Sequence, residues 1–193
     1  MSDSGDIANR GAGGDGAGIT IADASPGDAP EILAVQRLAF APAAVRYDIP
    51  DLPPLVESVE EVERAIAGSV VLKALDETGR LVGSVRGEDR DGDVYVGRLV
   101  VHPEAQRRGT ATALMLALED RFPDARRFEL FTGNFNEPGM GLYLKLGYAE
   151  TRRERVTDLL EAVYLDKPGP GARESQLKGP GAREPERAKP APR

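Results

Sequence analysis

The chain has 193 residues and a formal net charge of −7 at pH 7, and it contains no cysteine. The missing cysteine excludes disulfides, thiolate metal sites and cysteine nucleophiles, and no apolar run reaches the length of about 18 residues that a membrane span needs. The N-terminus lacks a basic segment followed by an apolar one, the pattern of a secretory signal. We therefore expect a cytoplasmic protein.

The two ends of the chain differ in composition from its middle. Residues 1–18 are rich in glycine and contain one large aliphatic side chain, Ile7, which is too little apolar surface to offset the entropy of ordering. Residues 167–193 are rich in proline and glycine and contain the sequence GPGARE twice, a composition typical of a semi-extended tail. We expect one globular domain over residues 19–166, between a disordered N-terminal segment (1–18) and a disordered basic tail (167–193).

Charge is spread unevenly over these three parts. The tail carries seven Lys or Arg and three Glu, and residues 1–18 carry three Asp and one Arg. The net charge of −7 therefore leaves about −9 on the body, which argues against nucleic acid as a partner and suits a cationic substrate such as an amine. The basic tail is either a solvated segment or a contact to an anionic surface.

The body is expected to begin with a strand and two helices. Apolar and polar residues alternate over 18–25 and predict a strand, and helical spacing of apolar residues predicts a helix over 27–40. We expect a proline-rich loop over 41–54. A second helix over 58–68 opens with a capping box at Ser58 and Glu61.

Three strand candidates follow over 69–77, 79–88 and 93–102, and short turns between them predict an antiparallel meander. The rest of the body is read as a helix over 109–122, a strand over 126–134, a helix over 138–148 and strand residues over 149–166. This order, β-α-α-β-β-β-α-β-α-β, predicts an α+β fold around one mixed, mostly antiparallel sheet flanked by helices.

The segment QRRGTAT, residues 106–112, connects the third meander strand to the next helix. Backbone N–H groups at a helix start are unpaired and lie at the positive end of the helix dipole, which suits a phosphate. A glycine and small residues let a ligand approach the backbone, and two arginines can add charge-assisted contacts. The alternative is a surface loop with solvated arginines. The candidate ligand-binding residues are Gln106, Arg107, Arg108, Gly109, Thr110, Ala111 and Thr112.

Two motifs resemble those of the GCN5-related N-acetyltransferase (GNAT) family. The loop is similar to the family's acyl-CoA pyrophosphate pattern Gln/Arg-x-x-Gly-x-Gly/Ala, here Gln106 to Ala111. A second segment, NEPGMGLYLKLGY from Asn136 to Tyr148, resembles the family's Asn-x-x-Ala-x-x-Leu-Tyr-x-Lys-x-Gly-Phe/Tyr. The element order is also the family's, so the resemblance covers residues 19–166.

The resemblance implies an N-acetyltransferase that uses acetyl-CoA as co-substrate and whose sheet has a splayed central strand pair. It implies that pantetheine pairs with that splayed edge and that a backbone N–H near Leu99, Val100 or Val101 stabilises the oxyanion. It places Asn136 among the acetyl-CoA contacts and makes Tyr143 the proton donor to the departing thiolate. Without the motif, Asn136 is also explained as a loop cap and Tyr143 as a packed aromatic. We expect direct attack by the amine in a ternary complex, since no residue suggests a covalent intermediate.

The sequence departs from the family pattern at two points. Gly139 stands where the second motif usually has alanine, and Pro138 precedes it. Many members carry a glutamate on the fourth strand as general base, where this chain has Gly97 and Arg98. The base is therefore left open, and a non-catalytic acyl-CoA-binding or regulatory module is the alternative function. Within the enzymes, O-acetyl transfer or a longer acyl donor is the alternative.

The acceptor is an amine of a small molecule or peptide, and no residue pattern identifies it. Four acidic residues lie where the family builds its substrate wall, and each is either an amine-binding group or a solvated charge: Asp48, Asp51, Glu57 and Glu60. We expect His102, the sole histidine, at the surface. The segment DRDGD at 89–93 is read as a hairpin turn and not a calcium loop, because loop positions six and twelve would be Val94 and Val100. We expect no metal, nucleic acid or membrane partner, and a homodimer is left open.

Overall fold

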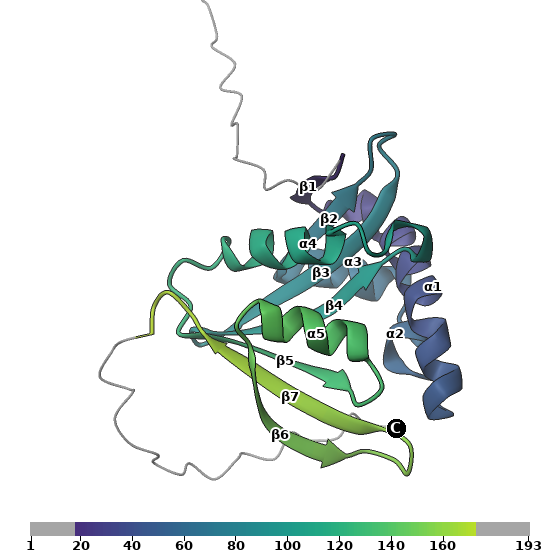
Figure 1. Ribbon diagram of the computed structural model, residues 1–193. Coiled ribbons are helices and arrows are strands. Elements are labelled where there is room, and N and C mark those ends of the chain that lie inside the picture. The colour runs from purple at the N-terminus through teal and green to yellow at the C-terminus, as the bar shows by residue number, and fades with distance from the viewer. Residues whose placement is uncertain (1–17, 173–193) are drawn as a thin grey trace, which may run out of the picture.

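The computed structural model describes residues 18–172, so the expected N-terminal segment and most of the expected tail lie outside the described residues. The strands form a seven-stranded sheet in the order β1-β2-β3-β4-β5-β7-β6 (Figure 1). The strands are β1 Thr20–Asp23, β2 Val70–Leu75, β3 Leu81–Arg90, β4 Asp93–Val101, β5 Arg127–Gly133, β6 Ala149–Arg155 and β7 Glu161–Pro168. The helices are α1 Ala29–Tyr47, α2 Pro53–Val56, α3 Val59–Gly68, α4 Thr110–Glu119 and α5 Glu137–Lys145, with short 3-10 turns η1 Pro26–Asp28 and η2 Pro103–Ala105.

The expected fold class is confirmed. Five of the six strand pairs are antiparallel, and β4 with β5 is the parallel pair. The crossover from β4 through α4 to β5 produces that pair, as the strand–helix–strand order predicted. The expected turn at 89–93 is a two-residue hairpin in which Asp91 and Gly92 both have positive φ, 54° and 90°, the conformation that two-residue hairpins favour.

Two apolar layers cover the two faces of the sheet, because side chains alternate across a strand. The larger core packs α4 and α5 on one face, around Leu114, Met115 and Phe128. The smaller core packs α1 and α3 on the other face, around Ile32, Val62 and side chains of β2 and β3. Among residues 18–172, no helix combines the length and apolar character required to cross a membrane.

The helix α1 is longer than the sequence predicted. We expected it to end at residue 40 before a proline-rich loop, but it continues through Pro42 to Tyr47. A proline in a helix interior removes one backbone hydrogen bond, and burial of Ala44 and Tyr47 compensates for that loss. The tyrosine ring stacks on Phe135 at 5.8 Å, and its hydroxyl accepts the Phe135 N–H (3.1 Å). The end of α1 is thereby joined to the loop after β5.

The C-terminal strand residues also differ from the prediction. The stretch 149–166 was read as one strand, but it forms the hairpin β6–β7, with a turn at Thr157 whose hydroxyl accepts N–H groups of Leu159 and Leu160. The expected domain boundary at residue 166 is wrong, because β7 includes Lys167 and Pro168. Beyond the strand, the Gly169 and Gly171 N–H groups donate to Arg126 and Ala125 carbonyls (2.8 and 2.7 Å).

The ammonium group of Lys167 explains why β7 continues past the expected boundary. It binds the carboxylate of Glu119 on α4 at 2.6 Å, and the Tyr148 hydroxyl donates to the same carboxylate (3.0 Å). Burial, with the negative Glu119 and that hydrogen bond, raises the pKa of Tyr148 well above its ordinary value. Tyr148, the last residue of the second motif, therefore anchors α4 to the end of the sheet.

Candidate active site

The strands β4 and β5 pair only at the start of β4. Their parallel register covers Asp93–Tyr95 against Arg127–Glu129, and beyond it the strands diverge (Figure 1). A bulge in β4 follows, where Arg98 and Leu99 together oppose one residue of β3, and Arg98 has a φ of 53°. Bulges bend a strand and increase its twist, which turns the second half of β4 away from β5. We call the opening between the two strands the β4–β5 gap, and it confirms the expected splayed pair.

Backbone direction decides which β4 amides face this gap. The His102 N–H donates to the Val82 carbonyl of β3 (2.8 Å). Because successive residues of a regular strand turn their N–H groups to opposite sides, the N–H group of Val101 faces the gap. The Val100 N–H faces β3 and its side chain is buried in the smaller core, so Val100 is a poor candidate for the expected oxyanion contact.

The loop from Gln106 to Gly109 leads from β4 into α4. The first helical bond of α4 runs from the Ala113 N–H to the Gly109 carbonyl (2.9 Å). None of the six backbone amides from Arg107 to Thr112 donates a hydrogen bond to the described part of the chain. Gly109 has a φ of 82° and open space where a Cβ would stand. These amides are therefore free donors at a helix N-terminus, an arrangement that suits an anion.

Side chains of the loop divide into two groups. Arg107 and Arg108 are exposed and form no ion pair with residues 18–172, which leaves both for an anion. The Gln106 amide donates to the Val101 carbonyl (3.3 Å), and the buried Thr110 hydroxyl donates to the Ala105 carbonyl (3.4 Å). These two side chains hold the loop in place, so Thr110 offers a ligand its backbone and not its hydroxyl. Ala111 and Thr112 are half-buried in the first turn.

Tyr143 lies on α5 with 8% of its surface exposed. Its ring packs edge-on against Tyr148, with 6.0 Å between the ring centroids. Burial raises the pKa of Tyr143 to about 12, and the neighbouring Tyr95 adds to the rise. The hydroxyl has no hydrogen-bond partner among the described residues. It is therefore a protonated and unengaged donor.

Sequence reasoning missed Tyr95, which is the last β4 residue paired with β5. Its ring lies over Gly97, where a Cβ would stand 3.3 Å from a ring carbon. Burial raises the pKa of Tyr95, while the positive charges of Arg90 and Arg98 oppose the rise. Tyr95 therefore lies within electrostatic range of both Tyr143 and Arg98, at the start of the gap. An available signal was the alternation of β4, which places this aromatic on the same face as Gly97.

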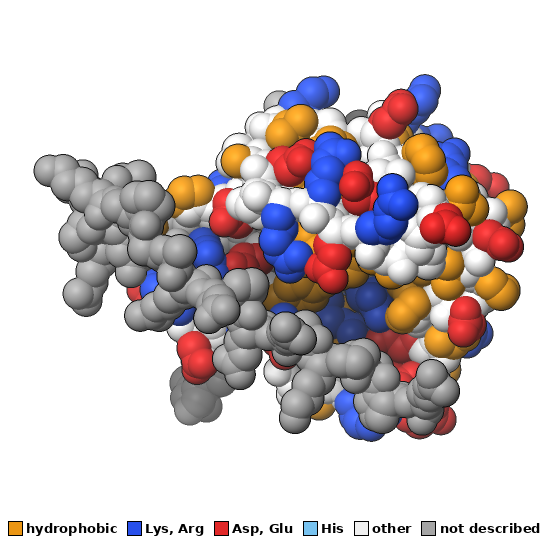
Figure 2. Space-filling view, turned by 90° about the horizontal axis from the view of Figure 1, so that it is seen from below, with side chains coloured by type: hydrophobic (Ala, Val, Ile, Leu, Met, Phe, Trp, Pro, Cys, Tyr) orange, Lys and Arg blue, Asp and Glu red, His pale blue; other side chains and the backbone are white. Residues whose placement is uncertain are grey.

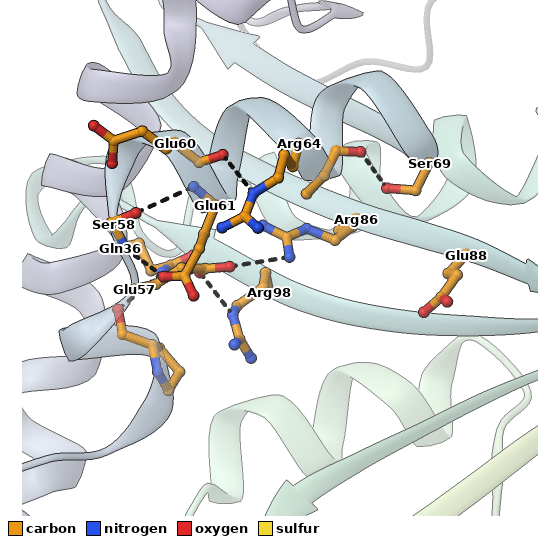
Figure 3. Close-up of polar contacts among 12 residues, drawn as sticks. Gln36, Glu57, Ser58, Glu60, Glu61, Arg64, Ser69, Arg86, Glu88 and Arg98 are labelled. Carbon is orange, nitrogen blue, oxygen red and sulfur yellow. Dashed lines mark hydrogen bonds and ion pairs between the residues drawn. The ribbon is translucent and has the colours of Figure 1, made fainter. Parts of the chain in front are cut away.

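Glu57 is the centre of an ion-pair cluster that the sequence did not predict (Figure 3). Its carboxylate accepts hydrogen bonds from Gln36 (2.7 Å), Arg86 (3.1 Å) and Arg98 (3.2 Å). The side chain of Glu57 is 9% exposed. We call Glu57, Arg86 and Arg98 the Glu57 cluster. Glu57 lies in the link between α2 and α3, and the two arginines come from β3 and β4.

Of the four acidic residues singled out from the sequence, Glu57 is the one that is buried and paired, so its interpretation as a solvated charge is wrong. Burial favours its neutral form, but the Gln36 hydrogen bond and the two arginine charges outweigh burial and hold the pKa below its ordinary value. A carboxylate with a lowered pKa and three donors is a weak general base. The other three acids, Asp48, Asp51 and Glu60, are exposed.

Asn136 caps the helix α5. Its side-chain oxygen accepts the Gly139 N–H (3.2 Å) and its amide donates to the Thr132 hydroxyl (2.8 Å). This geometry supports the interpretation of Asn136 as a cap. It also explains the departure from the family pattern, because a Cβ on Gly139 would stand 2.2 Å from the Asn136 amide nitrogen.

His102 lies outside the β4–β5 gap. Its Nδ1 accepts the Glu104 N–H (3.3 Å), and the ring borders a shallow depression of about 510 Å³ that α1 and the β2–β3 turn complete. None of the residues lining this depression belongs to the gap or to the Glu57 cluster.

Comparison with known proteins agrees with this geometry. The model of the acetyltransferase (GNAT) family matches residues 34–148, which include the gap, the loop and α5. The chain belongs to the GNAT family. It is 31% identical over 137 residues to the UPF0157 protein YqkA of Bacillus subtilis, covering 70% of this chain and 39% of that protein. It is 34% identical over 134 residues to a mycothiol acetyltransferase of Kineococcus radiotolerans, covering 68% and 43%.

This GNAT chain spans less than half the length of those two curated relatives. Its fold is similar to that of the PaiA N-acetyltransferase of Thermoplasma acidophilum, solved in complex with coenzyme A. The TM-score is 0.66 at 18% identity, covering 78% of this chain and 98% of that one. The family expected from the two motifs is thereby confirmed.

Proposed function

We propose that this GNAT chain transfers the acetyl group of acetyl-CoA to a primary amine by direct attack in a ternary complex. The observation that carries the proposal is the row of unpaired amides from Arg107 to Thr112 at the end of β4, together with Tyr143, which is within electrostatic range of Tyr95 at the start of the gap. The amides suit a diphosphate and the gap suits a reacting thioester. A coenzyme A complex of a structural neighbour and the acetyltransferase name of a curated relative support the same donor.

The loop and β4 position the donor in this proposal. The pyrophosphate binds the free amides at the start of α4, where the helix dipole favours negative charge, and Arg107 and Arg108 add charged contacts. Pantetheine pairs with the free edge of β4 as an added strand. The N–H of Leu99 or Val101 then stabilises the oxyanion that forms on the thioester carbonyl.

Tyr143 completes the transfer as the proton donor. The neutral amine nitrogen bonds to the carbonyl carbon, the carbon–sulfur bond breaks, and the thiolate takes the Tyr143 hydroxyl proton. The positively charged nitrogen then gives its surplus proton to solvent, and the Tyr143 phenolate regains a proton from solvent. The raised pKa of Tyr143 keeps that proton in place throughout the physiological range. Because its hydroxyl stays protonated, Tyr143 cannot serve as the base that deprotonates the amine.

No residue in the described part of the chain is assigned as the base that deprotonates the amine. A lysine-like amine is neutral in only about one part in 10³ at pH 7, and the Glu57 carboxylate is held by its three donors. This observation favours a second function, a non-catalytic acyl-CoA-binding module in which the loop binds acetyl-CoA and no transfer follows.

One pair of measurements separates the two functions. Calorimetry with acetyl-CoA tests the loop, and thiol release from acetyl-CoA in the presence of a panel of amines and alcohols tests transfer. Binding with amine-dependent thiol release supports the N-acetyltransferase. Binding without release from any acceptor supports the module, and alcohol-dependent release indicates O-acetyl transfer. Absence of acetyl-CoA binding overturns both.

A further inference from the structure

We propose that the acceptor carries an oxyanion, a carboxylate or a phosphonate, close to its amine, and that Arg98 binds this group. The inference rests on the proposed acetyl transfer and identifies the acceptor class of that same site. It assigns Arg98 a role in acceptor specificity.

The Glu57 cluster carries an excess of positive charge. Two guanidinium groups face one carboxylate, and the carboxylate is fully engaged by Gln36, Arg86 and Arg98. Neither of the terminal Nη groups of Arg98 has a hydrogen-bond partner within residues 18–172. The Arg98 side chain is 29% exposed, and Figure 3 shows its terminal nitrogens turned away from Glu57. Arg98 therefore presents two oriented donors, in a cluster whose two guanidinium groups share one carboxylate and leave one net positive charge.

The position of Arg98 relates these donors to the reaction. Arg98 and Leu99 form the bulge that opens the β4–β5 gap, and Arg98 lies three residues before Val101, whose N–H faces the gap. The Arg98 charge also acts on the hydroxyl of Tyr95, which in turn influences Tyr143. A group bound at the Nη atoms is therefore held by a residue of the bulge that borders the proposed thioester site. The planar fork of a guanidinium matches a carboxylate or phosphonate in two-point contact.

Glu57 holds the fork in place for this contact. The carboxylate binds the Nε of Arg98 and so fixes the rotation of the guanidinium. Arg86, on the far side of Glu57, is 21% exposed and binds the other carboxylate oxygen. A pre-oriented guanidinium loses less entropy when it binds an anion than a free side chain does.

An apolar wall lies on the same face of the sheet. The rings of Tyr95, Phe131 and Tyr164 follow one another across β4, β5 and β7 with centroids 6.5 and 5.7 Å apart. Phe131 is 49% exposed, and the guanidinium of Arg152 stacks on Tyr164 at 3.5 Å. From below, the molecule has a hollow in which hydrophobic and basic side chains lie together (Figure 2). An amine with an adjacent oxyanion and an apolar body, such as an apolar amino acid, fits these surroundings.

The test compares matched acceptors that differ only in the oxyanion. L-Amino acids with apolar, aromatic and polar side chains are paired with their decarboxylated amines, for example L-phenylalanine with phenethylamine, and with the corresponding aminophosphonates. We expect the anionic member of at least the apolar and aromatic pairs to have a kcat/KM about 10- to 100-fold higher, the range of hydrogen bonds to charged groups. The carboxylate and phosphonate series show which oxyanion is preferred.

Variants assign the preference to a residue. In Arg98→Gln the ratio of kcat/KM between paired acceptors should fall to near one, through the KM of the anionic acceptor, while the dissociation constant of acetyl-CoA is unchanged. Arg98→Lys keeps the charge beside Glu57 but loses the fork, and should recover part of the ratio. Arg80→Gln removes an exposed arginine that pairs with Asp76 and Glu104, away from the gap and the Glu57 cluster, and should keep the full ratio. Thermal melts establish that each variant is folded.

The outcomes are distinguishable from failure of the proposed function. Turnover of amines with no preference for the anionic member, or a preference that Arg98→Gln retains, overturns the inference and leaves acetyl transfer intact. Acetyl-CoA binding without thiol release from any acceptor overturns the transfer and the inference together.

Discussion

Replacing Tyr143 by phenylalanine removes the proposed acid and keeps the ring. The hydroxyl has no partner among the described residues, so its loss leaves no group unpaired, and the free energy of unfolding should change by less than about 0.5 kcal/mol. The edge-on packing against Tyr148 uses only the ring and should persist. The amides of the loop are untouched, so the dissociation constant of acetyl-CoA should stay the same.

The size of the catalytic loss follows from the pKa. A rise from 10.0 to about 12 disfavours the phenolate by about 3 kcal/mol, so Tyr143 is a weaker acid than a free tyrosine. General acids supply about 10² to 10⁴ in rate, and a weak acid acting on a thiolate, itself a tolerable leaving group, belongs at the low end. We expect kcat to fall about 10²-fold with the acceptor KM little changed.

The assay is single-turnover release of the coenzyme A thiol, with acceptor and enzyme saturating, so that chemistry and not product release limits the rate. Tyr95→Phe is the matched control, because it removes a neighbouring hydroxyl that is not assigned a proton transfer. Wild type should show no loss of kcat attributable to Tyr143 ionisation between pH 7 and 10. Equal single-turnover rates for wild type and Tyr143→Phe would refute the proposed role, and a lower melting temperature with normal turnover would identify a structural tyrosine.

Three further perturbations test the loop, the Glu57 cluster and the end of β7. Gly109→Leu should raise the dissociation constant of acetyl-CoA at least about tenfold by blocking the amides. The control Gly79→Leu carries the same backbone strain, because Gly79 has a similar φ of 83° and equal open space, and it should leave the dissociation constant unchanged. Equal effects of the two variants on the calorimetric affinity would contradict the phosphate site. Glu57→Gln should lower the free energy of unfolding at pH 7 by about 2 to 4 kcal/mol. The folded pKa of Glu57 lies below its ordinary value, so this stability is present above the ordinary carboxyl pKa and is lost as the pH falls through the folded pKa. Urea unfolding should therefore show a smaller difference between wild type and variant at pH 3, and an undiminished difference would disprove the ionic origin. A chain ending at residue 166 should melt about 5 to 10 °C below one ending at residue 172. The shorter chain lacks the ion pair between Lys167 and Glu119 and the backbone hydrogen bonds of Gly169 and Gly171. Equal melting temperatures would show that these contacts do not contribute to stability.

The local features of this protein could be predicted from sequence because short stretches of chain determine them. The capping box at Ser58 and Glu61 is present as expected, and the turn at 89–93 has the expected hairpin geometry. The loop after β4 lies before a helix, since glycine at a helix start depends on neighbouring residues alone. The two motifs therefore identified the family correctly.

The errors of prediction arose where distant packing overrides local preference. Pro42 argues for a helix end at residue 40, but the burial of Tyr47 against a loop 88 residues away extends α1. The composition after residue 166 resembles a tail, yet Lys167 finds a carboxylate 48 residues earlier in the chain. Neither partner is visible in the local sequence.

Sequence alone determined the fold class, the family and the position of the loop before α4, because periodicity, turns and motif spacing are properties of neighbouring residues. Only the tertiary structure joined Glu57 to Arg86 and Arg98, which lie 29 and 41 residues further along the chain. From the sequence alone a glutamate such as Glu57 is expected to be solvated. Its burial depends on which strand and which arginine the folded sheet brings next to it. The bulge at Arg98 likewise becomes visible only when β4 is paired with β3 on one side and separated from β5 on the other.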